Sequence, residues 1–222
     1  MKRATKRKAG FILGLSAWLV TVWLLWWSPV IYPLKLFVVL LHEVSHAAMA
    51  VATGGEVLRI AVTPDQGGIC YCPGGSAFLT LSAGYLGSLG FGALILVLAR
   101  ARRPAPRDST TLIGVAVLVL TTLYVRNAFG ILFGALFGAA LLALRSTGRT
   151  VHVWVLTGLG LTSCLYALLD IKSDVLDRPY LDSDARMLAE LTGVPTVVWG
   201  VLWISLGGLV SWWLFRKALA AA

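Results

Sequence analysis

The segment HEVSH places two histidines and a glutamate where they could act together on one metal ion. His42 and His46 are four residues apart, so on a helix their imidazoles lie on one face, about one turn apart. This spacing suits Zn²⁺, which makes water nucleophilic near neutral pH. Glu43, beside the first histidine, would accept the proton of that water and return it to a leaving amine. The pattern predicts hydrolysis of a peptide bond.

The surroundings of this segment decide between a metal site and a chance arrangement. HEVSH lies inside an apolar run, residues 34–52. Two histidines and a glutamate at bilayer depth cost on the order of a few kcal/mol unless they have a partner. One Zn²⁺ ion would be such a partner. The alternative is a polar cluster that lines a pore or packs against other helices, as in a transporter or channel.

A catalytic zinc site usually has a third protein ligand and one position left for water. Asp170 ends a later apolar run, where a carboxylate is unfavourable unless it faces a metal or a wet cavity. Asp174 shares its face if the helix continues. The alternative for both is a solvated helix end that pairs with Lys172 or Arg178. His152, at the beginning of the same run, is a weaker candidate.

The bulk composition shows what positions these residues. Of the 222 residues, 58% are hydrophobic and 13% are charged, with a mean hydropathy of +0.83. These values are typical of a membrane protein. We expect an all-α polytopic fold of six or seven transmembrane helices in a single domain, residues 1–222. The apolar runs are residues 11–27, 34–52, 76–99, 112–125, 128–144, 151–171 and 194–215.

Residues 53–75 differ from the apolar runs, because they are rich in Gly and Pro and alternate in character around residues 57–62. This pattern predicts two short strands joined at residues 64–68. A short β-hairpin-like, membrane-associated segment should therefore follow the HEVSH helix.

The formal net charge is +9, and the basic residues gather at segment ends. This distribution favours contact with the lipid bilayer and its anionic headgroups, not with nucleic acid. Five basic residues in 2–8 and four arginines in 100–107 both indicate a cytoplasmic location, although three full crossings would put them on opposite sides. Both indications hold only if an early segment is short or re-entrant. Otherwise the arginine loop is an exception to the rule.

Three cysteines give no disulfide framework. Cys70 and Cys72 are separated by one residue, a spacing that rarely bridges, and Cys164 is remote from both. No role is expected for them, although the CYC pair could bind a metal.

The motifs together resemble the site-2 protease family of intramembrane zinc metalloproteases, in particular its compact bacterial B-like branch. The resemblance covers residues 36–203 through HEVSHAAMAVATGGEV, QGG, SAGYLGS, LYALLDIKSD and SDARMLAELTGVPTVVWGVLW. It implies a zinc metalloendopeptidase of the bacterial cytoplasmic membrane. The implied ligands of its one Zn²⁺ ion are His42, His46 and Asp170, with Glu43 as the general base.

The resemblance also implies how substrate binds. In the family, a sheet-like segment pairs with an unwound substrate, and residues 56–75 stand in its place. Gly67, Gly68, Gly84 and Tyr85 are the corresponding substrate-binding candidates. The expected partner is a membrane protein or membrane-proximal peptide, cut in or near a transmembrane segment. The oligomeric state stays open.

Two departures from the family pattern leave a non-catalytic regulator or chaperone as an alternative. LYALLDI lacks the proline of the family's aspartate motif and has Ile171 in place of its glycine. Tyr85 and Ser88 replace residues of an Ala-Gly-Pro and Asn pattern. In SDARMLAEL we expect Asp182 or Ser183 to cap a solvated helix, with Asp184 at the positive end of its dipole.

Overall fold

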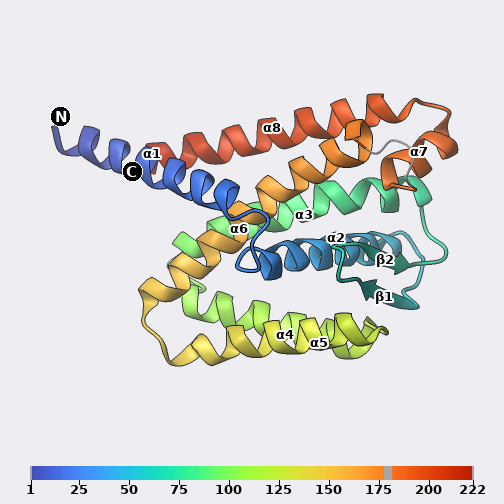
Figure 1. Ribbon diagram of the computed structural model, residues 1–222, viewed down its shortest axis with the longest axis horizontal. Coiled ribbons are helices and arrows are strands. Elements are labelled where there is room, and N and C mark those ends of the chain that lie inside the picture. The colour runs from blue at the N-terminus through green and yellow to red at the C-terminus, as the bar shows by residue number, and fades with distance from the viewer. Residues whose placement is uncertain (1, 178–181, 222) are drawn as a thin grey trace.

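The computed structural model describes residues 2–177 and 182–221, and its architecture is a helical bundle with one small sheet (Figure 1). The predicted all-α polytopic fold with a β-hairpin after the HEVSH helix is confirmed. The long helices are α1 (Lys2–Leu24), α2 (Tyr32–Ala52), α3 (Ala77–Arg100), α4 (Pro106–Tyr124), α5 (Ala128–Ala143), α6 (Arg149–Lys172) and α8 (Thr196–Ala221). Shorter elements are β1 (Arg59–Val62), β2 (Gly68–Tyr71), η1 (Leu144–Ser146), η2 (Ser173–Asp177) and α7 (Asp184–Thr192).

Five helices in the described part of the chain are long and apolar enough to cross a membrane. They are α2, α3, α5 with η1, α6 with the start of η2, and α8. Helix α1 adds a shorter apolar stretch, Lys8–Leu24. Helix α4 packs along α5, and a Cβ on Gly114 would lie 3.1 Å from the carbonyl oxygen of Gly138. The expected number of crossings, six or seven, stays a prediction.

Helices α1 and α2 run in the same direction, and α3 returns (Figure 1). The ring of Phe11, in the first half of α1, lies 6.1 Å from that of Phe215 near the end of α8. The guanidinium of Arg100, at the end of α3, lies 5.9 Å from the same Phe11 ring. The beginning of α1 and the end of α3 are therefore at the same end of the bundle. The two basic segments lie together because α1 and α2 advance in one direction between them.

The hairpin folds back beside α2. Its strands are antiparallel, with Ile60 opposite Cys70 and Val62 opposite Gly68. Ile60 and Val62 are buried in the core, and the Tyr32 hydroxyl at the start of α2 donates to the Pro64 carbonyl at 2.6 Å. Alternation of buried and exposed side chains, visible in the sequence, therefore fixes which face of β1 meets the helices.

The α4–α5 connection secures the outer edge of β1. Val125 bridges Ile60, and the Arg126 backbone N–H donates to the Ile60 carbonyl at 3.1 Å. The Asn127 amide donates to the Val62 carbonyl at 2.7 Å and accepts from the Val62 N–H at 3.2 Å. This side chain takes the place of a neighbouring strand. In the described two-stranded sheet, β2 pairs with β1 on one side and lies close to α2.

Helix α3 packs closely against α2 and α6 because small residues line its surface. A Cβ on Gly92 would meet the Ser163 side chain at 2.8 Å, and one on Gly160 would meet the Gly92 carbonyl at 2.9 Å. Without a hydrophobic driving force between helices in lipid, such close backbone approach is a main source of stability. Gly84 and Gly87 of α3 in the same way allow close approach to α2, which carries HEVSH.

We expect Asn127→Ala to destabilise the protein, because two backbone groups of Val62 lose their partner. The cost should be about 1–3 kcal/mol, seen as a fall of several degrees in the thermal unfolding midpoint in detergent. Ser82→Ala is the control, since the Ser82 hydroxyl donates only to a carbonyl of its own helix. Equal midpoints for the two variants would contradict the role given to Asn127.

Candidate metal centre and active site

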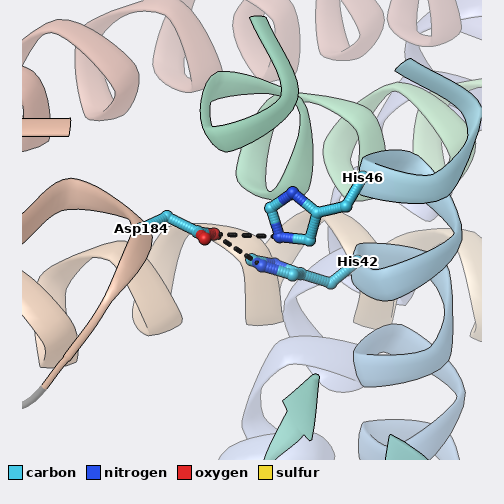
Figure 2. A group of neighbouring side chains, drawn as sticks. All are labelled: His42, His46 and Asp184. Carbon is cyan, nitrogen blue, oxygen red and sulfur yellow. Dashed lines mark hydrogen bonds and ion pairs between the residues drawn. The ribbon is translucent and has the colours of Figure 1, made fainter. Parts of the chain in front are cut away.

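Three largely shielded side chains from two distant elements converge at one point (Figure 2). Helix α2 supplies His42 and His46, and the first residue of α7 supplies Asp184. Oδ2 of Asp184 lies 2.8 Å from Nε2 of His42 and 3.2 Å from Nε2 of His46. The predicted pairing of the two histidines on one helix face is what brings both Nε2 atoms to one carboxylate.

The second ring nitrogen of His46 is fixed by the backbone. Nδ1 of His46 lies 2.7 Å from the carbonyl oxygen of Thr80 in α3. A carbonyl only accepts hydrogen bonds, so Nδ1 carries a proton, and Nε2, which faces Asp184, is the ring atom that would bind a metal. The ring of His42 is held differently, edge-on to the Tyr85 ring with centroids 4.9 Å apart.

The donor set fits a zinc ion. Two imidazole nitrogens and one carboxylate oxygen are a usual protein complement of a catalytic zinc. The ligand atoms of His42, His46 and Asp184 all lie within 4.8 Å of one another, close enough for the three residues to hold one ion. Burial alone would raise the pKa of Asp184, but hydrogen bonds with His42 and His46 hold that pKa below its ordinary value. The carboxylate is thus kept in the ionised form that a metal needs.

Helix α7 positions Asp184. The Ser183 hydroxyl accepts a hydrogen bond from the Arg186 backbone N–H at 3.3 Å, and Gly193 ends the helix in the left-handed conformation. The expected cap at Ser183 is therefore present. The expectation of a solvated helix start is wrong, because Asp184 is only 8% exposed and lies on the same buried face as Ala185 and Leu188. The apolar residues that share this face of α7 are the feature of the sequence that could have indicated a buried Asp184.

The other candidates for the third ligand are outside the group of converging ligand atoms. Asp170 is not in the group of converging ligand atoms, although its charge is near enough to act on His42 and Tyr85. Asp174 accepts a hydrogen bond from the Tyr85 hydroxyl at 2.5 Å. His152 is buried near the opposite end of α6, 3.4 Å from the Thr147 hydroxyl. The structure thus brings Asp184 to the histidines where the resemblance had implied Asp170.

Glu43 lies between the histidines' helix and the hairpin. Its side chain is buried, and the Cys70 backbone on β2 is within hydrogen-bonding reach of the carboxylate. A Cβ on Gly68 would collide with Glu43, so this glycine permits the close approach of β2. Gly67 instead belongs to the turn, where its N–H donates to the Thr63 hydroxyl at 3.2 Å.

Gly84 and Tyr85 of α3 lie against the imidazoles. A Cβ on Gly84 would collide with Nε2 of His42 and Cε1 of His46. Tyr85 is buried and contacts the ring of Trp203, with centroids 5.0 Å apart, as well as that of His42. Gly84 and Tyr85 thus lie against histidine side chains of the candidate site, and their contact with substrate stays a prediction.

The comparisons with known proteins decide the family. The peptidase M50B-like family matches the chain over residues 15–214. The chain belongs to this family. M50 peptidases are zinc metallopeptidases, which agrees with the donor set at His42 and His46, and the family assignment made from the motifs is confirmed. No curated protein and no solved structure matched.

At family level, this M50B-like chain is therefore an intramembrane metalloprotease. Its apolar helices make it an integral membrane protein. The buried position of Glu43 beside both histidines agrees with that assignment.

The M50B-like chain departs from expectation at its cysteines. Cys70 and Cys72 form a disulfide, and the expectation that they do not bridge is wrong. Two residues of regular strand rise about 6.7 Å, whereas these Cα atoms are 5.7 Å apart, within the usual range for a disulfide. Strand β2 ends at Tyr71, and the departure from extended geometry there makes the bridge possible.

The third ligand is testable by metal content. We expect Asp184→Asn to lose most of its zinc, because a neutral amide is a poor replacement for a carboxylate ligand. Asp170→Asn should keep its zinc. Asp182→Asn is the control, two residues from Asp184 but with a side chain 91% exposed. Zinc per protein is measured on purified variants, and loss in Asp170→Asn with retention in Asp184→Asn would exclude our ligand set.

Close packing at the site predicts a second effect. Gly84→Ala should lower zinc occupancy and activity, because the added methyl group would displace the imidazoles of His42 and His46. Gly90→Ala, on the same helix with open space around it, should leave both unchanged. Metal analysis and a cleavage assay of both variants provide the comparison, and a fully loaded, active Gly84→Ala protein would refute the packing argument.

Proposed function

We propose that the protein is a zinc metalloendopeptidase that hydrolyses peptide bonds in or near transmembrane segments of other membrane proteins. The observation that carries this proposal is the convergence of His42, His46 and Asp184 beside Glu43, all four side chains being largely shielded from solvent. Ionisable side chains are unfavourable inside an apolar bundle and are not needed for helix packing, so their presence together favours a chemical role.

The division of roles follows from the positions. A Zn²⁺ ion held by His42, His46 and Asp184 would supply Lewis acidity, which makes water nucleophilic near neutral pH. Glu43 accepts the proton of that water and returns it to the amine that leaves. Nδ1 of His46 donates a hydrogen bond to the Thr80 carbonyl, and this bond keeps the imidazole ring oriented.

The hairpin supports the proposed substrate class. A transmembrane helix hides its carbonyl groups in its own hydrogen bonds, so it must unwind before a peptide bond can be attacked. An unwound segment can pair with the edge of a strand. Strand β2 is suited to this task because its backbone passes beside Glu43 at Gly68 and Cys70.

Two alternatives explain less of the site. A regulator or chaperone without catalysis needs no carboxylate at Glu43, yet this side chain is buried beside both metal ligands. A transporter or channel needs a path for its ion. In the described structure the two histidines are instead joined to Asp184 by direct contacts at 2.8 and 3.2 Å.

Glu43→Gln separates catalysis from metal binding. The variant should keep its zinc but lose at least about 100-fold in the rate of cleavage of a reconstituted transmembrane substrate, because the amide cannot accept the proton. Glu56→Gln, an exposed glutamate in the loop after α2, is the matched control. Removal of zinc by a chelator should abolish activity, and added zinc should restore it. Full activity of pure Glu43→Gln would exclude Glu43 as the base.

A further inference from the structure

Tyr85 joins the candidate metal centre to a carboxylate that lies outside the group of converging ligand atoms. Its ring meets the ring of His42 edge-on, with the centroids 4.9 Å apart and an interplanar angle of 85°. Its hydroxyl donates a hydrogen bond to Oδ2 of Asp174 at 2.5 Å. One buried side chain of α3 therefore contacts a metal-ligand candidate through its ring and Asp174 through its hydroxyl.

The contacts around Tyr85 fix the position of its ring. A hydroxyl that donates to a carboxylate at this distance makes a charge-assisted hydrogen bond, which is roughly twice as strong as a neutral one. Asp174 lies in η2, 89 residues further along the chain, so the bond ties α3 to the turn that continues α6. The ring of Trp203 in α8 lies 5.0 Å from the Tyr85 ring. Elements α3, η2 and α8 thus hold this ring against His42.

Helix α3 orients the two histidines in different ways. The Thr80 carbonyl accepts a hydrogen bond from Nδ1 of His46 at 2.7 Å. The imidazole of His42 instead lies against the Tyr85 ring. Groups that contact metal ligands from behind fix the ring orientation and contribute to metal affinity. Tyr85 has the position for His42 that the Thr80 carbonyl has for His46.

The packing of Tyr85 also extends to the helix that supplies the third ligand candidate. Tyr85 belongs to one buried apolar cluster with Ala185 and Leu188 of α7. Helix α7 lies against α3 and η2 (Figure 1). Ala185 directly follows Asp184 in the chain. The positions of His42 and Asp184 therefore depend on contacts with the same tyrosine side chain.

We propose that Tyr85 and Asp174 are positioning residues of the metal centre. Asp174 accepts the hydrogen bond of the Tyr85 hydroxyl, and the Tyr85 ring keeps the imidazole of His42 directed toward the point that it shares with His46 and Asp184. This inference deepens the proposed function and rests on it where it concerns cleavage. It gives Asp174 a part in the site that is separate from metal binding.

Burial favours this role over direct contact between Tyr85 and substrate. Only 1% of the Tyr85 surface is exposed, and its hydroxyl is bonded to Asp174. The ring is flanked by His42 and Trp203. A residue in these surroundings acts on the reaction through the histidine that it contacts.

Zinc affinity tests the proposal without reference to cleavage. Tyr85→Phe keeps the ring and removes the hydroxyl, and Asp174→Asn removes the charge from the acceptor. Each variant should bind Zn²⁺ about 10- to 100-fold more weakly in competition with a chelator. The double variant should be no weaker than the weaker single variant, because both changes affect the same hydrogen bond. Unchanged affinity in both single variants, or fully additive losses, would overturn the proposal.

Two matched controls separate this effect from a general loss of tyrosine or aspartate. Tyr124→Phe changes a tyrosine at the end of α4. Asp177→Asn changes an aspartate of the same η2 turn, whose half-exposed side chain pairs with Lys172 at 2.8 Å. Both controls should bind zinc as the unaltered protein does. A loss in the controls equal to that in Tyr85→Phe and Asp174→Asn would contradict the assignment.

Co²⁺ in place of Zn²⁺ gives a second readout, because its visible absorption depends on the geometry of its ligands. Saturated with Co²⁺, Tyr85→Phe should show an altered spectrum, which a loss of stability alone would not produce. With saturating zinc, kcat should fall while KM stays the same. A raised KM with unchanged zinc affinity would indicate a substrate contact and overturn the proposal. Metal effects in a protein that cleaves nothing would contradict the proposed function alone.

Discussion

Two imidazoles and two carboxylates lie inside an apolar helix bundle, and the rest of the structure serves to make that arrangement tolerable. Unpartnered, these groups would each cost several kcal/mol at such depth. Here Asp184 lies at hydrogen-bond distance from both His42 and His46, and the three residues form a donor set that zinc binds. The carboxylate comes from Asp184 in α7, a segment that is remote from α2 in the sequence. The fold places this side chain beside the middle of α2.

Close backbone approach is the means by which the site is assembled. Gly84 lets α3 come against the imidazoles, and Gly68 lets β2 come against Glu43. A side chain at either position would occupy the space of a metal ligand or of the base. The same principle operates along α3 at Gly92, where α6 approaches. Small residues thus act as structural determinants of the chemistry, although they supply none of it.

The hairpin has two parts in the fold. Its strand β2 packs against Glu43, the proposed general base, and the hairpin also has a strand edge. Asn127 and Val125 fix β1 from one side, and Tyr32 fixes the turn from the other. Strand β2 is thereby held beside Glu43. The presence of this hairpin followed from glycine, proline and alternating residues in the sequence. Its placement followed from residues 32 to 65 positions away in the chain, Tyr32 and Asn127 among them.

The sequence by itself determined the membrane environment, the hairpin and the pairing of His42 with His46, because each depends on residues close together in the chain. The tertiary structure alone placed Asp184 beside the two histidines, since His42 and Asp184 are 142 residues apart and Asp170 offered an equally reasonable carboxylate. It likewise decided the Cys70–Cys72 bridge and the shared direction of α1 and α2. Local spacing fixes what one helix face can bind, whereas the packing of separate helices fixes which distant side chain reaches it.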